Sequence, residues 1–533
     1  RITFRPFRRS SPEHTAARPL LQRSVAMKLL TAALAASCVT AIPQFTSYKR
    51  RVQELAEQLD VKGPSQTKAD DPTLFWFTSP LDHFDRQVDT TFQQRSYQNA
   101  TFFDGTGPVF ICVGGEGPAL DATVLTTSVH CADMVELAPK VGALMVAVEH
   151  RYYGESIPVS GHRGTENLRW LSSQQALGDL ANFHQQLVAN YSLTDANKWV
   201  SFGGSYPGMM SGFFRLKYPN LVHASVSSSS PWEAQLDMPE YQDIVGESLA
   251  ITSVGGSDSC KATVVDGHAT IGDMITTAEG RASLVQTFNF CSEDALATQA
   301  TAGEWAGSGV IEVPSQENDP ACQTMWGEDP GCDIGSICEI MDATDGDDVA
   351  KLAAVSAAQH KGNCIGGWTE AHIGKAEALL KAHVEKLGSR GASDALSWPY
   401  QTCTEWGFYQ TCEIGSACPF VQGYNNLSSS VAMCESLFGI DADAVSAQID
   451  ASNAYYGGSK PAGSRILFPN GNVDPWHGLG VLEAPRDSEP VMMIDGASHH
   501  FWTHIESEIT QPEVQAAKEA IQKQVVYWLS EEN

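Results

Sequence analysis

The chain has 533 residues, of which 42% are hydrophobic and 18% are charged, and its formal net charge is −29. This composition is that of a globular protein and excludes an intrinsically disordered chain. The acidic charge excludes nucleic acid as a partner, because a protein that binds a polyanion needs a basic face. The length is sufficient for two domains, or for one domain with a large insertion.

The first 41 residues have the composition of targeting or processing segments. Residues 1–26 begin with Arg, contain six Arg and show no apolar period, so we interpret them as an over-extended, non-native N-terminus. Residues 27–41, MKLLTAALAASCVTA, combine one Lys, an apolar stretch and small residues, which predicts a secretory signal peptide cleaved after Ala41. A mitochondrial presequence is the alternative, because residues 1–26 are rich in Arg and poor in acidic residues. No later segment has 18 consecutive apolar residues, so we expect no membrane span.

Cysteine usage also predicts export. The chain has thirteen Cys, and twelve remain once Cys38 is assigned to the signal peptide. An even number is typical of a disulfide framework formed in an oxidising compartment. We expect no metal site, since the sequence has no C-x-x-C motif and no paired His spacing. The sequons at Asn99, Asn190 and Asn426 are candidate glycosylation sites in a secreted chain.

From about residue 72 to 230, short apolar runs alternate with amphipathic stretches, which predicts an α/β domain. We assign residues 42–231 to the first part of this domain. Apolar positions at helical spacing predict a helix over 173–189 and another after Ser205. Buried strands are predicted at 109–113, 143–148, 199–202 and 223–226.

The composition changes between residues 232 and 430, a range that holds nine of the twelve remaining cysteines. Helical runs such as 368–387 predict an inserted, mainly helical cap with several disulfides. One pattern occurs twice, as Trp326 followed by CDIGSIC at 332–338 and as Trp406 followed by CEIGSAC at 412–418. This repeat predicts two similar cystine loops, unless it arose by chance. The acidic run 342–348 lacks the ligand pattern of an EF-hand loop, so we interpret it as a solvated turn.

The α/β pattern returns in residues 431–533, which we assign to the second part of the domain. Strands are predicted at 465–468 and 491–494, and a closing amphipathic helix is predicted at 512–529.

Residues 201–210, SFGGSYPGMM, are similar to a nucleophile elbow, a strand–turn–helix motif usually written G-x-S-x-G. Gly203 and Ser205 fit this motif, but Pro207 occupies its last position and the glycine follows at Gly208. Proline is tolerated in the first turn of a helix, where its missing N–H has no partner in the helix. We therefore predict a catalytic serine followed by a helix that begins at Pro207.

A serine nucleophile needs a base that is itself oriented by a carboxylate. In α/β-hydrolase folds these partners follow in the order Ser, Asp, His, on loops after later strands. Here Asp474 follows strand 465–468, and the adjacent pair His499 and His500 follows strand 491–494. Two non-catalytic interpretations stay open. Ser205 could be a turn serine in a phosphate loop, although the chain has no G-x-G-x-x-G or GK[ST] motif. Asp474 could simply cap a turn.

The negative charge that develops on a substrate carbonyl oxygen needs two N–H donors. The amide of Tyr206 is one candidate. The second is expected from the loop GGEGP at 114–118, at Gly115 or Glu116, because a glycine-rich turn lets backbone amides approach a ligand closely. Glu116 is also a candidate contact for a substrate ammonium.

Seven stretches carry a more specific signal. They are VGGEGP (113–118), VEHRYYGES (148–156), LSSQQALGDL (171–180), FGGSYPGMMSGFFRLKYP (202–219), WPYQTCTEWGFYQT (398–411), PNGNVDPWHGLG (469–480) and DGASHH (495–500). Together they resemble the serine peptidase family that includes lysosomal Pro-X carboxypeptidase, dipeptidyl peptidase II and thymus-specific serine protease. The resemblance extends over most of the chain, from about residue 74 to 528.

The resemblance implies an α/β-hydrolase fold in which a large, mainly helical, disulfide-rich insertion caps the active site. It implies cleavage of short peptides next to proline, from one peptide end, at acidic pH and without a cofactor. The nucleophile would be Ser205, the acid Asp474 and the base His499, with Trp476 and Trp406 as candidate substrate contacts.

Several points stay open after the resemblance. Carboxypeptidase and dipeptidyl aminopeptidase activities are nearly balanced, and a small residue could replace proline at the scissile position. An esterase or lipase on the same core and a non-catalytic secreted binding protein are the alternatives. Peptides are the expected partners, a homodimer is compatible with the resemblance, and the expected location is extracellular, lysosomal or vacuolar.

Overall fold

The computed structural model describes residues 72–127, 129–159, 165–318, 322, 330–369 and 394–531. The predicted non-native N-terminus, the signal peptide, Trp326 and nearly all of the helical run 368–387 lie outside these residues. Among the described residues, no helix combines the length and the apolar character needed to cross a bilayer.

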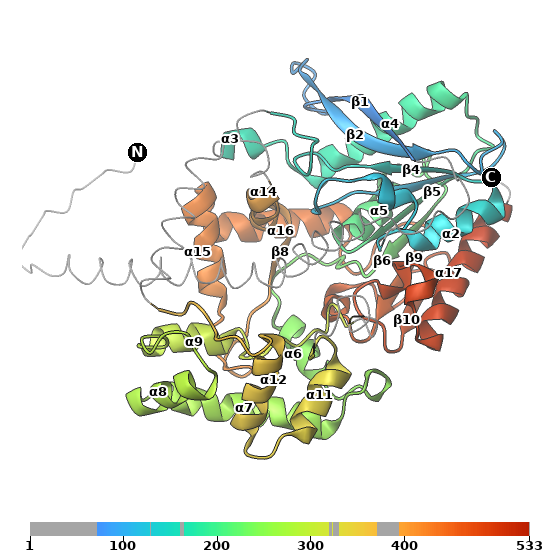
Figure 1. The fold of residues 1–533 in the computed structure, drawn as a ribbon. Helices are drawn as coiled ribbons and strands as arrows, with labels where there is room; N and C mark the ends of the chain where they lie inside the picture. The colour runs from blue at the N-terminus through green and yellow to red at the C-terminus, as the bar shows by residue number, and fades with distance from the viewer. Residues whose placement is uncertain are drawn as a thin grey trace, which may run out of the picture.

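An eight-stranded sheet forms the centre of the protein, in the order β1-β2-β4-β3-β5-β6-β9-β10 (Figure 1). Strand β2 is antiparallel to both β1 and β4, and the remaining neighbours are parallel. The strands are β1 (Thr73–Pro80), β2 (Thr91–Asn99), β3 (Val109–Val113), β4 (Leu144–Val148), β5 (Trp199–Gly204), β6 (Ala224–Ser228), β9 (Ile466–Gly471) and β10 (Val491–Ile494). Every strand predicted from an apolar run is therefore present, and β1 and β2 are additional.

Helices cover both faces of the sheet, so that alternate residues of a strand enter different cores. Residues 109, 111 and 113 of β3 pack with α4 (Ser173–Tyr191) and α5 (Tyr206–Lys217). Residues 110 and 112 pack on the opposite face with α2 (Ala132–Val141) and α17 (Pro512–Ser530). A short helix, α3 (Thr165–Leu168), precedes α4. This three-layer arrangement with its single antiparallel second strand is an α/β-hydrolase fold, as predicted.

The chain between β6 and β9 is mainly helical. Figure 1 shows α7, α8, α9, α11 and α12 grouped below the sheet, and α14, α15 and α16 to its left. The helices are α6 (Pro239–Ser248), α7 (Asp258–Met274), α8 (Ala278–Thr287), α9 (Gln299–Gly307), α11 (Ile334–Ala343), α12 (Asp348–Gln359), α14 (Asp394–Gln401), α15 (Leu427–Phe438) and α16 (Ala442–Tyr456). Two short strands, β7 (Gln235–Asp237) and β8 (Gly407–Tyr409), pair in parallel within this insertion.

The twelve cysteines that follow the predicted signal peptide form six disulfides. They are Cys112–Cys131 in the core, and Cys260–Cys338, Cys291–Cys364, Cys322–Cys332, Cys403–Cys434 and Cys412–Cys418 in the insertion. Cys322 and Cys332 also lie beside Asp333, but their sulfurs are joined to each other and offer no thiolate to a metal.

The prediction of two similar cystine loops is wrong. In the copy at 412–418 the two cysteines are bonded to each other. In the copy at 332–338 they are bonded to different partners, Cys322 and Cys260. This second copy begins α11, where the Asp333 side chain caps the helix by accepting the Ser336 N–H. Two similar sequences therefore form a closed cystine loop at 412–418 and the start of a helix at 332–338.

Candidate active site

Ser205 lies in the sharp turn between β5 and α5. Its backbone has φ +65° and ψ −136°, a conformation that a residue with a side chain rarely adopts. The strain is maintained by regular structure on both sides: the Ser205 N–H donates to the Ser228 carbonyl of β6 at 3.0 Å, and the Ser205 carbonyl accepts the Met209 N–H at 3.0 Å. Such an outlier, supported from both sides, is typical of a functional turn.

The glycines around Ser205 explain why the sequence of this motif departs from G-x-S-x-G. A Cβ on Gly203 would lie 2.3 Å from the Pro207 carbonyl oxygen, and a Cβ on Gly208 would lie 2.3 Å from the Ser230 Oγ. Gly208 therefore permits the close packing of α5 on β6, one position later than the usual motif requires. The helix begins at Tyr206, one residue before the predicted start, so Pro207 occupies its first turn.

Asp474 and His499 are joined by a hydrogen bond across 25 residues of sequence. Asp474 follows β9, is fully buried and caps the short 3-10 helix η4 (Pro475–Leu479) by accepting the Trp476 N–H on Oδ1 at 2.9 Å. Its other oxygen, Oδ2, accepts the Nδ1–H of His499 at 2.9 Å. In a neutral His499 this leaves Nε2 as the basic nitrogen, and Nε2 has no hydrogen-bond partner among the described residues.

The neighbouring histidines have other contacts. The His500 ring lies against Gly204, where a Cβ would be 2.7 Å from its Cδ2, and its Nδ1 is 3.2 Å from the Thr503 Oγ1. Burial and the adjacent His499 lower the pKa of His500 well below its usual range. The His477 ring bonds the backbone carbonyl of Asp474, not its carboxylate. Of the adjacent pair, His499 is the one whose ring reaches the Asp474 carboxylate.

The glycine-rich loop after β3 lies on the first turn of α5. The Gly114 N–H donates to the Val148 carbonyl at 2.9 Å, which fixes the start of the loop. A Cβ on Gly115 would lie 2.4 Å from the Pro207 Cγ, so this loop and the elbow are in direct contact. Tyr206, Gly115 and Glu116, the three residues predicted to hold an oxyanion, are therefore neighbours in space.

The side chain of Tyr206 enters a buried polar network that the sequence interpretation missed. Its hydroxyl accepts a hydrogen bond from the Gln401 Nε2 at 2.9 Å and lies 3.0 Å from the His150 Nε2. The His150 Nδ1 donates to the Arg151 carbonyl at 2.7 Å, so Nε2 of the neutral ring accepts from the Tyr206 hydroxyl. Burial lowers the pKa of His150 to about 4 and keeps the ring neutral.

The network continues into the insertion. Gln401 Nε2 also donates to Glu405 at 3.1 Å, and Glu405 accepts the Ser173 N–H at the start of α4. Burial raises the pKa of Glu405 above its usual value. His150, Gln401 and Glu405 all belong to the sequence stretches quoted above, VEHRYYGES and WPYQTCTEWGFYQT, which was the only signal that could have indicated them.

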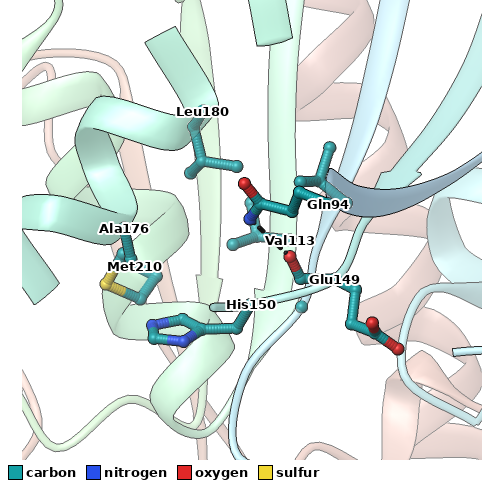
Figure 2. Close-up of a pocket in the computed structure, with 9 residues that line it drawn as sticks. Gln94, Val113, Glu149, His150, Ala176, Leu180 and Met210 are labelled. Atoms are coloured by element: carbon teal, nitrogen blue, oxygen red, sulfur yellow. Dashed lines mark hydrogen bonds between the residues drawn. The ribbon is translucent and has the colours of Figure 1, made fainter. Parts of the chain in front are cut away.

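A small cavity lies beneath the glycine-rich loop (Figure 2). It is lined by Gln94, Val113, Gly114, Val148, Glu149, His150, Ala176, Leu180 and Met210. Its walls are mostly apolar, and the Gln94 Nε2 donates to the Glu149 carbonyl at 2.8 Å across it. Since none of Ser205, Asp474 and His499 lines this cavity, it is a packing defect behind the site and not the site itself.

The two tryptophans predicted as substrate contacts are both buried. Trp476 lies 6.3 Å from His499 between ring centroids, so it adjoins the acid–base pair. Trp406 is 1% exposed and packs among Tyr206, Phe213 and Phe408. Its indole N–H has no hydrogen-bond partner in the part of the chain that the structure describes.

The three sequons differ in accessibility. Asn190 is exposed at the end of α4. Asn426 is half-buried and caps α15 by accepting the Ser429 N–H. Asn99 is only 4% exposed in β2, and its Oδ1 accepts the Thr101 N–H at 3.0 Å.

Comparison with known proteins gives consistent relatives. Residues 79–521 match the family described as serine carboxypeptidase S28. Human thymus-specific serine protease is 33% identical over 86% of this chain and 87% of its own length. Mouse thymus-specific serine protease is 31% identical, over 86% and 88% respectively. Bovine lysosomal Pro-X carboxypeptidase is 24% identical, over 86% and 88%.

Proposed function

The chain belongs to the serine carboxypeptidase S28 family and is a serine-type peptidase, and from this premise we propose that it is an exopeptidase of short peptides that uses Ser205, His499 and Asp474. The observation that carries the proposal is the hydrogen bond between the His499 Nδ1 and the buried Asp474 carboxylate, 2.9 Å long. It leaves the His499 Nε2 as the basic nitrogen. Ser205 occupies a strained turn after β5, and Asp474 follows β9, which runs parallel to β5 in the same sheet.

The mechanism is acyl transfer. His499 Nε2 takes the hydroxyl proton of Ser205 as Oγ attacks the peptide carbonyl carbon, and the Tyr206 N–H with the loop at Gly115 and Glu116 stabilises the oxyanion. The peptide C–N bond then breaks, and the imidazolium returns the proton to the leaving amine. In the second half of the reaction His499 takes a proton from water, which attacks the acyl carbon. The ester bond to Ser205 then breaks, and the imidazolium returns the proton to the Ser205 Oγ. Asp474 keeps the proton on Nδ1 and stabilises the imidazolium.

The proposed substrate class is a short peptide with proline, or a small residue, at the scissile position, cleaved at acidic pH. A relative whose name specifies Pro-X substrates supports this class, at 24% identity. The aromatic surroundings, with Trp476 beside His499, suit a flat apolar ring. Glu116, in the glycine-rich loop that contacts the elbow at Pro207, stays the candidate contact for a substrate ammonium.

Two variants test the chemistry. Ser205→Ala and His499→Ala should each abolish peptide hydrolysis while the folded protein keeps its melting temperature and circular dichroism spectrum. A fluorophosphonate probe should label the wild-type protein at Ser205 and should not label Ser205→Ala. Turnover that persists in purified Ser205→Ala would reject the proposal.

A substrate panel at pH 5 tests the specificity. It contains peptides blocked at the N-terminus or at the C-terminus, each with Pro or Ala at the scissile position, and a set of acyl esters. Cleavage only of peptides with a free C-terminus indicates a carboxypeptidase, and cleavage only with a free N-terminus indicates a dipeptidyl aminopeptidase. Hydrolysis of the esters alone would contradict peptidase activity.

We also propose that the protein matures in the secretory pathway. The six disulfides support an oxidising compartment. On accessibility, Asn190 is the most suitable glycan acceptor and Asn99 the least, since a glycan cannot be accommodated on a buried strand residue.

A further inference from the structure

One short segment of the insertion, residues 313–318 between α9 and α11, is bonded to both loops that carry the acid and the base. We refer to it as the strap. The backbone carbonyl of Gln316 accepts the N–H of His499 at 3.0 Å. The side-chain Oε1 of the same residue accepts the indole N–H of Trp476 at 2.9 Å. Gln316 therefore contacts the histidine loop through its main chain and the aspartate loop through its side chain.

The strap is itself fixed to the insertion. Gln316 Oε1 accepts a second hydrogen bond, from the Tyr241 hydroxyl of α6, at 2.7 Å. On one side of Gln316, the Ser315 Oγ lies 2.5 Å from the Ser248 Oγ at the end of α6. On the other side, the Asn318 Oδ1 accepts the Ile334 N–H at 2.8 Å, at the start of α11. Gln316 is thus supported from two helices.

The histidine loop has little regular structure of its own to orient the base. His499 follows the four-residue strand β10 and a turn, and the next residue, His500, has φ +44°. Among the residues that the structure describes, one hydrogen bond holds the ring of His499, from its Nδ1 to Asp474. Asp474 in turn accepts the N–H of Trp476, so the orientation of the whole pair depends on where the Trp476 and His499 backbones lie. The His499 backbone N–H and the Trp476 indole N–H both donate to Gln316.

We propose that Gln316 is a positioning residue through which the helical insertion sets the geometry of the His499–Asp474 pair. This rests on the proposed function, since it presumes that His499 is the base for Ser205. Gln316 is bonded to the backbone N–H of His499 and not to its Nε2, which has no hydrogen-bond partner in the described part of the chain. Its effect is on the rate of the chemical step, because a displacement of the base by about 1 Å can cost about a hundredfold in rate.

The test compares three variants at the two hydrogen-bonding positions. Gln316→Met keeps the length of the side chain but removes the acceptor, and should lower kcat about ten- to a hundredfold with a change in KM of less than about threefold. Gln316→Glu keeps an oxygen acceptor for Trp476 and should restore most of kcat. Tyr241→Phe removes one of the two bonds to Oε1 and should give a smaller loss.

Gln422→Met is the matched control. Gln422 is also a half-buried glutamine of the insertion, but its side chain holds the small cystine loop at 412–418. It bonds the Gly415 N–H and the Ser416 and Cys418 carbonyls. Its loss should lower the melting temperature at least as much as Gln316→Met and leave kcat unchanged. The rate of Ser205 labelling by a small fluorophosphonate, which needs no peptide contacts, should fall in Gln316→Met and not in Gln422→Met.

The outcomes separate the two proposals. Wild-type kcat and labelling rate in Gln316→Met would overturn the role of Gln316, and so would an equal loss of kcat in Gln422→Met. If Ser205→Ala or His499→Ala keeps its activity, the proposed function itself fails. Loss of activity in those two variants together with full activity in Gln316→Met would overturn the positioning role alone.

Discussion

Ser205 and His499 stand at the two ends of the proposed proton transfer, and the protein holds them by different means. Ser205 is enclosed by regular structure: a buried strand precedes it, a helix follows it, and the neighbouring strand β6 accepts its N–H. His499 lies in a loop, and its backbone N–H donates to the carbonyl of Gln316, a residue of the insertion that is distant in sequence. The position of the nucleophile is therefore fixed by the core alone, whereas the position of the base is fixed by the insertion as well.

This difference separates stability from catalysis. Changes beside the nucleophile disturb the sheet and its packed helix, so they should lower the stability of the fold. Changes beside the base alter one loop and should lower activity while the fold persists. The predictions below test this contrast at residues on each side.

The largest effect is expected on the base side, at Asp474. Asp474→Asn should lower kcat by about 10⁴-fold, because an amide cannot hold the proton on the His499 Nδ1 and stabilise the imidazolium. The melting temperature should change little, since the Asn Oδ1 can still accept the Trp476 N–H that Asp474 accepts now. Kinetics and thermal unfolding of the purified variant measure both quantities. A large drop in the melting temperature of Asp474→Asn would contradict the prediction that changes beside the base lower activity without unfolding the protein.

An intermediate effect is expected on the nucleophile side, at His150. Its pKa is about 4 in the folded protein because of burial, and 6.5 is the ordinary value. The unfolded chain therefore binds more protons between these values, so the stability that neutral His150 provides is complete above pH 6.5 and is lost as the pH falls towards 4. The loss amounts to about 3 kcal/mol, at about 1.4 kcal/mol per pH unit. Below that range the Tyr206 hydroxyl also loses its acceptor.

Urea unfolding at pH 4.5 and at pH 7 measures this linkage as the difference between wild type and His150→Gln. The variant should lose less stability on acidification than the wild type. Asp133→Asn is a control of opposite sign: burial raises the pKa of Asp133 to about 7, so its contribution is present at low pH and is lost as the pH rises through that value. Parallel pH profiles for wild type and His150→Gln would contradict the assignment.

The parts of the fold that the sequence predicted are those fixed by local rules. Continuous apolar runs predicted β3 and β4, which are buried on both faces, and the elbow was predicted from glycines next to Ser205. Asp474 and His499 were indicated because each follows a strand, and parallel strands bring their ends to one edge of a sheet. Strand β2 carries many polar residues, such as Gln93, Gln94 and Arg95, and gave no apolar run to detect. Strand β1 does contain an apolar run, Leu74–Phe77, which the sequence interpretation did not assign to a strand.

The parts that were missed depend on contacts between distant residues. Gln401 reaches Tyr206 across 195 residues, and Gln316 reaches Trp476 across 160. No periodicity or spacing rule indicates such polar pairs, because only the folded chain brings them together. The same reason explains the error at 332–338: a cysteine bonds the partner that the fold places beside it, which the similar sequence at 412–418 could not reveal.

The smallest effect is expected within the elbow, at the contact between Gly115 and Pro207. Pro207→Ala should cost about 0.5–1 kcal/mol of stability, because proline restricts the unfolded chain, and should change kcat/KM by less than about twofold. Gly115→Ala should lower kcat/KM by about tenfold, since its Cβ would lie 2.4 Å from the Pro207 Cγ and would displace the loop that carries the proposed oxyanion donors.

The double variant decides whether that contact is the cause. With the proline ring removed, the new methyl group has room, so Gly115→Ala combined with Pro207→Ala should recover most of the activity that Gly115→Ala alone loses. A coupling free energy of about 1 kcal/mol is expected from the kinetic double-mutant cycle. Strict additivity would mean that Pro207 does not set the position of the glycine-rich loop. Coupling would mean that Pro207 sets the position of the glycine-rich loop through its contact with Gly115. The proline would do so without removing the Tyr206 N–H, which is the proposed oxyanion donor.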